Sequence, residues 1–525
     1  MFTRFLASAA VLGLSAGMAA AEYKLTILHT NDFHSRFEPI NKYDSACGDE
    51  DNAEGKCFGG SARLVTAVEE ARGRADNSIL VDGGDQFQGS LFYTYYKGKV
   101  AAEFMNKLGY DAMTVGNHEF DDGPEVLRGF IDSVDFPVLM SNADYADEEL
   151  LTDKIKKSAV IEVGGEKIGL IGLTPEDTHD IASPGPNITF SDPVPAVQAE
   201  VDKLTGEGVN KIIVLSHSGY GVDQRVAQET TGVDVIVGGH SNTYLSNTSD
   251  KAAGPYPTVV NGVQIVQAYA YGKFLGELNV TFDDDGNVVS AEGEPLIMDN
   301  AVTEDQAALD RIAELAVPLD EIRNKVVAEA SASIEGDRSV CRVQECEMGN
   351  LVADAMLARV ADQGAQIAIA NSGGLRASID PGEVTMGEVL TVLPFQNTLS
   401  TFEISGQGVI DALENGVSQV EEVKGRFPQV AGMTFTWDPS VAPNEGRIVE
   451  VMVAKDGGFE AIDPAATYLV VTNNYVRNGG DGYSVFSGDD KNAYDFGPDL
   501  ADVTAEYLAE NAPYQPYLDG RIKQK

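Results

Sequence analysis

Five short apolar segments of the chain are each followed by polar residues of the kinds that bind metals and transfer protons. The motifs are TNDFH (30–34), GGDQFQG (83–89), GNHEFD (116–121), SHSG (216–219) and GGHSN (238–242). They supply nine candidate residues: Asp32, His34, Asp85, Asn117, His118, Asp121, His217, His240 and Asn242. One aspartate after a strand is usually a turn or cap residue, and one histidine is more often structural than a ligand. Five such motifs together indicate a shared site.

The mixture of oxygen and nitrogen donors in these motifs predicts a site for divalent ions such as zinc or manganese, rather than calcium or a thiolate-bound zinc. Two such ions lying close together can share one carboxylate, lower the pKa of a bound water and hold the oxygens of an in-line displacement. That chemistry suits the hydrolysis of a phosphate ester. His29 lies inside an apolar segment and His179 follows no motif, so we expect both to be structural.

The apolar segments themselves predict the strands of an α/β fold. They cover residues 24–29, 78–82, 112–115, 137–140, 167–172, 211–215 and 233–237, with further strands over 258–270 and 275–282. Short β-branched segments separated by helical patterns are typical of buried strands in such folds. Because ligands bind at the carboxyl ends of these strands, the fold would bring the five motifs to one edge.

A helical pattern separates the two halves of the chain. Apolar residues recur at spacings of three and four from about Glu304 to Ala330, and Pro318 is a candidate kink. A chain of 525 residues is too long for one ordinary core, so we expect this helix to connect two domains.

The formal net charge of −45 limits the partners of the protein. A surface of this charge repels nucleic acid and anionic membranes, and we expect neither as a partner. A small anionic substrate would need a locally positive site, made by metal ions or arginine. The remaining acidic residues are interpreted as a solvated surface.

Residues 1–21 are typical of a secretory signal. Arg4 precedes an apolar run from Phe5 to Met18, and three alanines, 19–21, provide a cleavage site. The run is short for a membrane span, so we expect a soluble protein in the periplasm or outside the cell.

The chain has four cysteines, which allow three pairings. Export permits disulfides, and the spacing favours the two local pairs, Cys47–Cys57 and Cys341–Cys346. The pairs are far apart and lack CxxC spacing, which argues against a zinc knuckle.

The set D-x-H, GGDxxxGS, GNHEFD, SHSG and GGHSN resembles the calcineurin-like metallophosphoesterases. With the second half included, the chain resembles the 5′-nucleotidase family over nearly its whole mature length. The motifs that carry this resemblance, in order, are LHTNDFHSRFE, GNHEFDDG, CRVQECEMGNLVADAM, NSGGLR, LPF and NGGDGY. GGHSNTYL, AYAYGKFLGEL and the Cys341–Cys346 loop are especially similar to the animal ecto-5′-nucleotidases.

The resemblance implies two metal ions, held by residues of the first half. Asp32 and His34 would bind one ion, and Asp85 would bridge both. The second ion would be bound by Asn117, His217 and His240. Zinc is the expected metal, with manganese or cobalt as alternatives.

The resemblance also separates the remaining residues of these motifs by role. His118 would face the phosphate rather than bind metal, and Asp121 would orient and charge it, because an imidazolium stabilises the charge of a phosphoryl transition state. Some bacterial members have Gln or His where this chain has Asn242, so Asn242 would reach either substrate or a metal-bound water. Glu119 and Asp122 are expected to be caps or solvated charges.

Recognition of the substrate is implied for the second half. Arg342, Asn371 and Arg376 match family residues that hold phosphate or ribose, and a guanidinium fork suits phosphate. Phe395 and Tyr475 match two aromatic positions that sandwich the base, although both residue types are also common in cores. Asp481 matches the acceptor for ribose hydroxyls. Tyr475 replaces the phenylalanine that family members often have and keeps the stacking face.

We therefore expect an α/β fold with two domains. After the signal (1–21) would come a metallophosphoesterase sheet sandwich with helices (22–302), a linker helix (303–327) and a second α/β or α+β substrate-binding domain (328–525). The site would lie between the domains, and hinge or rotational motion is expected, as in the family.

The function that follows is an exported, metal-dependent hydrolase. It would cleave nucleoside 5′-monophosphates to nucleoside and phosphate, with attack by a hydroxide activated at two metal ions. Alternatives on the same scaffold are hydrolysis of nucleoside di- or triphosphates, UDP-sugars or 2′,3′-cyclic nucleotides. A nucleotide-binding protein without turnover would not need the full metal set or the His118–Asp121 pair. The sequence leaves open the preferred base and whether the protein is a monomer or a homodimer.

Overall fold

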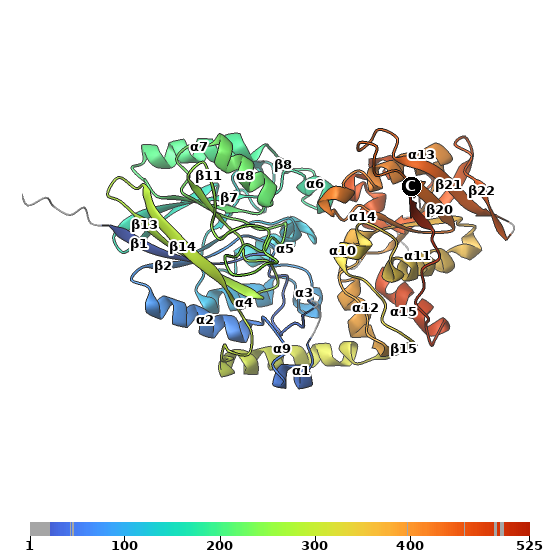
Figure 1. Cartoon of the computed structure of the whole chain (residues 1–525), viewed down its shortest axis with the longest axis horizontal. Helices are drawn as coiled ribbons and strands as arrows, with labels where there is room; N and C mark the ends of the chain where they lie inside the picture. Colours follow the sequence, from blue (N-terminus) through green and yellow to red (C-terminus); the bar gives the residue numbers. More distant parts are fainter. Residues whose placement is uncertain are drawn as a thin grey trace, which may run out of the picture.

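The computed structural model describes residues 22–42, 44, 47–395, 397–455, 457–487, 491–493 and 498–525. The chain forms two α/β domains that lie side by side, the N-terminal one coloured blue to yellow-green and the C-terminal one yellow to red in Figure 1. The segment interpreted as a secretory signal, 1–21, lies outside the described residues.

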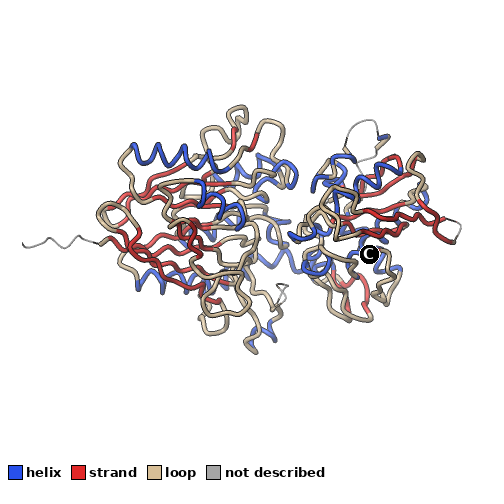
Figure 2. The backbone as a smooth tube through the Cα atoms, turned by 45° about the horizontal axis from the view of Figure 1, so that its top comes forward, coloured by secondary structure: helices blue, strands red, loops and turns tan. Residues whose placement is uncertain are grey.

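The N-terminal domain is built on two packed six-stranded sheets (Figure 2). The first has the order β14-β13-β1-β2-β3-β4, with β14 (Val288–Ile297), β13 (Phe274–Phe282), β1 (Tyr23–Thr30), β2 (Ser78–Asp82), β3 (Ala112–Thr114) and β4 (Val138–Leu139). The second has the order β11-β12-β10-β9-β7-β6, with β11 (Thr258–Val260), β12 (Val263–Val266), β10 (Val235–Val237), β9 (Ile212–Ser216), β7 (Glu166–Leu173) and β6 (Ser158–Val163). Every apolar segment that predicted a strand contains one, and the 258–270 segment contains the hairpin β11–β12, which ends at Val266.

Central strands such as β1, β2 and β9 are apolar on both faces because both of their faces are covered. In β1, Leu25 and Ile27 pack against the other sheet, whereas Leu28 packs against helices on the outside. The helices α2 (Ser61–Arg74), α4 (Lys99–Leu108) and α5 (Gly123–Ile131) contribute to that outer core. On the opposite side, α7 (Pro193–Gly206) and α8 (Tyr220–Glu229) cover the second sheet. The strands β1 to β4 run parallel, so their carboxyl ends lie at one edge.

The connecting helix is shorter than the apolar spacing predicts. Helix α9 covers Gln306–Arg323, begins at an Asp305 side chain that accepts a bond from Ala308 N, and contains Pro318. The prediction of helix to residue 330 is wrong, because Val326–Ala330 forms strand β15 and pairs with β17 (Gly382–Thr385). Two adjacent β-branched residues and an available partner strand outweigh the helical spacing there. Much of α9 packs on the core of the N-terminal domain.

The C-terminal domain contains two four-stranded sheets. One has the order β18-β23-β16-β19, with β18 (Leu399–Ser405), β23 (Thr467–Asn473), β16 (Ile367–Asn371) and β19 (Pro428–Ala431). The other has the order β22-β21-β20-β24, with β22 (Gly458–Ala461), β21 (Ile448–Lys455), β20 (Met433–Trp437) and β24 (Ile522–Gln524). Helices α11 (Glu347–Arg359) and α15 (Leu500–Glu510) share one core, and α13 (Gly406–Gly416) belongs to the other.

The two domains meet through short elements. Helix α12 (Met386–Val392) contacts α9 and α3 (Leu91–Tyr96), and Leu390 packs against the cores of both domains. Helix α6 (Thr178–Ile181) contacts the turn η5 (Gly480–Gly482). Because η5 contains Asp481, these contacts place predicted substrate-binding residues beside the N-terminal domain.

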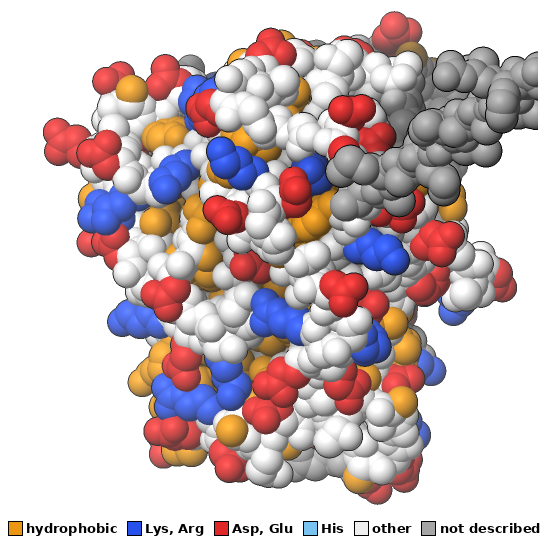
Figure 3. All heavy atoms as spheres, turned by 90° about the vertical axis from the view of Figure 1, so that its left-hand side faces the viewer, with side chains coloured by type: hydrophobic (Ala, Val, Ile, Leu, Met, Phe, Trp, Pro, Cys, Tyr) orange, Lys and Arg blue, Asp and Glu red, His pale blue; other side chains and the backbone are white. Residues whose placement is uncertain are grey.

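Three further predictions can be compared with the fold. Both disulfides form as predicted, Cys47–Cys57 and Cys341–Cys346. Among the described residues, none of the helices combines the length and the apolar composition needed to cross a lipid bilayer. On the face shown in Figure 3, acidic side chains are spread among basic and neutral ones, as a solvated surface requires.

Candidate active site

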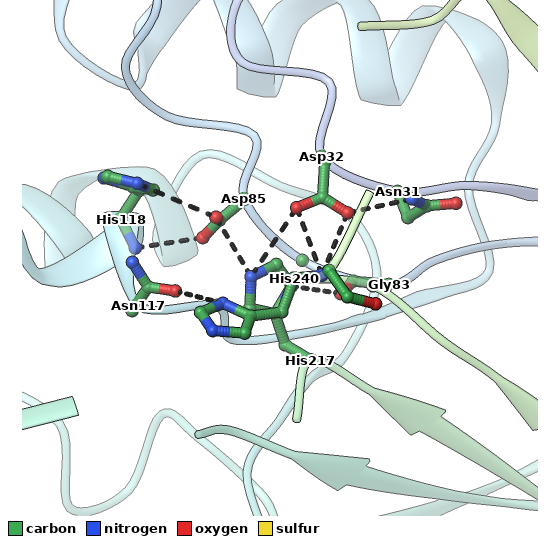
Figure 4. Close-up of polar contacts among 12 residues, drawn as sticks. Asn31, Asp32, Gly83, Asp85, Asn117, His118, His217 and His240 are labelled. Carbon is green, nitrogen blue, oxygen red and sulfur yellow. Dashed lines mark hydrogen bonds and ion pairs between the residues drawn. The ribbon is translucent and has the colours of Figure 1, made fainter. Parts of the chain in front are cut away.

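The five polar motifs meet at the carboxyl ends of strands in both sheets of the N-terminal domain. Asp32 follows β1 and Asp85 follows β2, while His217 and His240 follow β9 and β10. Figure 4 shows these four side chains together with Asn117, from the end of β3. The expectation that the sheets bring the motifs together is met by the geometry.

Asp85 lies at the centre of the group. Its Oδ2 is 2.9 Å from His217 Nε2, 3.8 Å from His34 Nε2 and 4.0 Å from His118 Nε2. Asp32 Oδ1 lies 3.8 Å from the same His217 nitrogen. One carboxylate thus faces three imidazoles, which is the arrangement expected of a bridging ligand.

The main chain turns sharply where these side chains leave the strands. Asp32, His34 and Asp85 have φ values of +51°, +52° and +60°, and His240 and Asn242 have +68° and +50°. Such conformations cost about 1–3 kcal/mol each for residues other than glycine and cluster at functional sites. Five of the nine strand-end candidates thus adopt a main-chain conformation that is rare outside glycine.

Two of the imidazoles are oriented by main-chain carbonyls. His34 Nδ1 lies 3.1 Å from Phe87 O, and His217 Nδ1 lies 2.6 Å from Gly83 O. Donation of Nδ1–H to these acceptors leaves the lone pair of each Nε2 directed at the site, as in metal-ligating histidines. His217 Nε2 is buried and makes no hydrogen bond, despite its distance to Asp85.

The protonation states of the histidines and the nearby carboxylates also favour binding of a metal cation. Burial lowers the pKa values of His34 and His240 well below the usual range, which keeps both rings neutral, the form that binds metal. Burial opposes the charged form of His217 too, but the carboxylates of Asp85 and Asp32 raise its pKa to about 10. The same carboxylates would attract a metal ion in place of that proton. Among the residues that the structure describes, two groups of side chains have the spacing of metal ligands: His34, Asp85 and His118, and Asp85, His217 and His240.

His118 and Asp121 form the predicted pair. His118 Nδ1 lies 2.6 Å from Asp121 Oδ2. Burial lowers the pKa of His118, but Asp121 and Asp85 outweigh it, so the net shift is upward. His118 also has ligand spacing to His34 and Asp85, which leaves a ligand role as the alternative to a phosphate-facing one.

The residues predicted to bind ribose and base form a connected group in the C-terminal domain. Asn371 Nδ2 donates to Asp481 Oδ2 at 2.6 Å. Tyr475 Oη donates to Asp481 Oδ1 at 3.3 Å and accepts from Asp481 N at 3.1 Å. Phe395 stacks on His118 with ring centroids 5.7 Å apart and planes at 18°. The second half of the predicted site therefore contacts the first.

A cluster of four arginines accompanies these residues: Arg36, Arg338, Arg342 and Arg376. The guanidinium carbons of Arg36 and Arg338 each lie 5.4 Å from the ring centre of Tyr271, and Arg376 lies over Phe395 at the same distance. Burial and mutual repulsion lower the pKa of Arg342 to about 10 and of Arg376 to about 9. In a chain of net charge −45 this is a local concentration of positive charge suited to a phosphate.

Arg36 and Arg338 are not among the residues predicted from the sequence. Arg36 nevertheless lies two residues after His34, and Arg338 four residues before Arg342. Asn242, with its amide in the orientation that satisfies both neighbours, donates to Asp32 Oδ1 at 3.1 Å and accepts from Arg338 Nη1 at 2.7 Å. It thus joins a predicted metal ligand to the C-terminal domain. No motif could reveal a contact between residues so far apart in the chain.

The interpretation of Glu119 as a cap or a solvated charge is wrong. Its side chain is fully buried and bonded to main-chain N–H groups. Asp122 is partly exposed and accepts a bond from Tyr93 Oη at 2.6 Å. His29 and His179 are structural, as expected: His29 is buried against Tyr256 Oη at 2.8 Å, and His179 bonds to Ile188 O.

Comparisons with known proteins agree with this geometry. Residues 25–244 match the calcineurin-like phosphoesterase family, and residues 326–488 match the 5′-nucleotidase C-terminal domain. The 5′-nucleotidases of Diplobatis ommata and Homo sapiens are each 37% identical, over 98% of this chain and 93% of theirs. The crystal structure of a 5′-nucleotidase precursor from Thermus thermophilus is 42% identical, with a TM-score of 0.90 over 96% of this chain and 99% of that one. A calcineurin-like phosphoesterase domain implies a dimetal centre, and the chain belongs to the 5′-nucleotidase family of metal-dependent hydrolases.

Proposed function

We propose that the protein hydrolyses nucleoside 5′-monophosphates to nucleoside and phosphate. The observation that carries this proposal is the stacking of Phe395 on His118, because it joins a predicted base-binding residue to a phosphate-facing one across the two domains. The names of the relatives point to the same substrates. The substrate would lie with its phosphate toward Asp85 and its base toward Phe395.

Two divalent ions would be held by the strand-end residues. Asp32, His34 and Asp85 are proposed for one ion, and the other would share Asp85 with Asn117, His217 and His240. Histidine nitrogens beside carboxylates favour zinc, with manganese or cobalt as alternatives. Such ions, when bound, supply an activated water and neutralise charge on the phosphate oxygens.

The chain's own groups then act on charge and position. Asp121 holds the proton of His118 Nδ1, which favours the imidazolium. The opposite ring nitrogen, Nε2, lies 4.0 Å from Oδ2 of Asp85, the proposed bridging ligand, and therefore faces the proposed metal site. From there it would donate to a phosphoryl oxygen. A donor fixed in advance stabilises the negative charge that grows in the transition state.

Recognition of the nucleotide is assigned to the C-terminal domain. Arg342 and Arg376, with Arg338 and Arg36 beside them, would hold the phosphate and the sugar. Asp481, fixed by Asn371 and Tyr475, would accept bonds from ribose hydroxyls. Phe395 and Tyr475 would stack on the base.

We further propose the domain limits and location given by the sequence: a signal over 1–21, domains at 22–302 and 328–525, and a linker over 303–327 that includes α9. The two disulfides agree with an exported protein of the periplasm or the extracellular space. A nucleotide is the proposed partner, and either a monomer or a homodimer is compatible with the site.

The test is phosphate release from AMP, ADP, ATP, UDP-glucose and 2′,3′-cyclic AMP by one metal-loaded preparation. The proposal expects the highest kcat/KM with AMP. A preference for UDP-glucose or the cyclic nucleotide would replace it with one of the alternative hydrolase activities. Binding of AMP without phosphate release from any substrate would indicate a binding protein.

A further inference from the structure

Glu119 follows His118 in the GNHEFD motif, but its side chain bonds to the main chain instead of facing the proposed phosphate site. It is 0% exposed, and its carboxylate accepts four main-chain hydrogen bonds. Oε1 accepts from Gln86 N at 2.8 Å and from Phe87 N at 3.2 Å. Oε2 accepts from Gly116 N at 2.7 Å and from Asp85 N at 3.0 Å. Within the described part of the chain, no lysine or arginine forms an ion pair with it.

These donors belong to two segments that carry proposed metal ligands. Residues 85–87 follow β2 and begin with Asp85, whereas Gly116 precedes Asn117 at the end of β3. A return bond closes the arrangement, because His118 N donates to Asp85 Oδ1 at 2.9 Å. The Glu119 carboxylate therefore joins the segment of the bridging ligand to the turn that carries Asn117 and His118.

The segment that Glu119 binds is strained at its first residue and just after its last. Asp85 has φ +60° and Gln88 has φ +66°, conformations that cost about 1–3 kcal/mol each outside glycine. Hydrogen bonds to an ionised acceptor are the stronger class and can offset that cost. The fit is also tight, since a Cβ at Gly116 would lie 2.2 Å from Asp85 Oδ1 and 2.9 Å from Glu119 Oε2.

The number of donors requires a carboxylate. Two carboxylate oxygens offer about four lone-pair positions, which match the four N–H groups. A glutamine has one oxygen, and its NH₂ group would face two N–H donors, leaving them unsatisfied in a buried place. Each such loss costs about 1–3 kcal/mol.

We propose that Glu119 is a positioning residue of the dimetal centre, whose carboxylate sets the place of Asp85 against Asn117 and His118 before ions bind. The inference rests on the proposed function only in taking the ions to be catalytic. Partners that orient metal ligands change metal affinity by about 10–100-fold when they are lost. Glu119 orients its ligands through their main chain.

The test measures ion binding itself. Metal-free wild type and Glu119→Gln are titrated with Mn²⁺ by calorimetry, and kcat on p-nitrophenyl phosphate is then followed against Mn²⁺ concentration. We expect affinity for the ions to fall about 10–100-fold in Glu119→Gln. We also expect excess Mn²⁺ to restore much of its kcat, because every proposed ligand is intact.

Glu414→Gln is the matched control. The Glu414 carboxylate also accepts three main-chain bonds, from Gly446, Arg447 and Ile448, but in the C-terminal domain, which carries none of the proposed metal ligands. This control should lower the Tm and leave ion affinity as in the wild type. An equal loss of affinity in Glu414→Gln would reduce the effect to general destabilisation and overturn the proposal.

Wild-type ion affinity in folded Glu119→Gln would also overturn it. If that variant does not fold, Glu119→Asp replaces it, since the shorter carboxylate cannot reach both segments and must likewise bind ions more weakly. Wild-type affinity for Mn²⁺ in Glu119→Asp would then contradict the positioning role of Glu119. Failure of the wild type to cleave AMP would contradict the proposed function. The ion affinities of the variants would still test the positioning role of Glu119, because they are measured without AMP.

Discussion

The ring of His118 in the N-terminal domain stacks on the ring of Phe395 in the C-terminal domain, with centroids 5.7 Å apart. A residue proposed to act on phosphate therefore touches a residue proposed to bind the base. A substitution at Phe395 would disturb both roles at once. Tyr475 contacts Asp481 instead, and so it can separate recognition of the base from phosphate chemistry.

Tyr475→Ala should lose kcat/KM for AMP and keep nearly full activity on p-nitrophenyl phosphate. Base stacking is worth about 1–3 kcal/mol, or roughly five- to 150-fold in affinity. Tyr475→Phe is the control, because it keeps the ring and removes only the hydroxyl bonded to Asp481. Steady-state kinetics on both substrates, at a temperature where all three proteins are folded, make the comparison. Equal loss on the two substrates would remove Tyr475 from the nucleotide site.

His118→Ala should retain its metal ions and lose about 10²–10⁴ in kcat, the usual contribution of a positioned proton-bearing group. Asp121→Asn should show a smaller loss in the same direction, because His118 keeps its place but loses the charge that favours the imidazolium. Elemental analysis of the purified variants and kcat on AMP are the two measurements. Loss of one ion with His118→Ala would support the ligand role that its spacing to His34 and Asp85 also allows.

His29 should make stability fall in mildly acidic solution. Burial lowers its pKa from 6.5 to about 3, so the folded protein keeps it neutral while the unfolded chain protonates it below pH 6.5. Between those values the unfolded state binds more protons, and the free energy of unfolding decreases as pH decreases. From pH 7.5 to 5.0 the wild type should lose about 2 kcal/mol more than His29→Gln.

Urea unfolding of both proteins at the two pH values measures that difference. His29→Gln is neutral at both, and all acidic residues are shared, so their contribution cancels. Parallel losses of stability in the two proteins would show that His29 is not held neutral by the fold.

The sequence predicts the N-terminal domain well because its signals are local. The β-branched segments of β2 and β9 are buried on both faces. Each polar motif closely follows its strand, so the position of Asp85 or His217 could be inferred from neighbouring residues alone. The sequence pattern misplaces the end of α9, because the apolar spacing is helical up to Val326, whereas the partner strand β17 lies about sixty residues further along the chain.

The residues that sequence reasoning misjudged depend on distant contacts. Glutamate is usually a surface residue. Glu119 is buried and accepts main-chain hydrogen bonds only because the fold brings residues 85–87 against it. Arg338 and Asn242 meet across the domains, at a distance along the chain where no spacing rule applies. Family motifs identify the candidate site residues. The hydrogen bonds of Glu119 to two ligand-bearing segments and the cluster of four arginines become visible only in three dimensions.

The dimetal mechanism is tested most directly by AMP hydrolysis with protein that is stripped with EDTA and then loaded stepwise with Zn²⁺ or Mn²⁺, with bound metal determined at each step. We expect no turnover in the metal-free protein and full activity as the metal content approaches two ions per chain. Full turnover without metal, or full activity at one ion per chain, would contradict the dimetal mechanism.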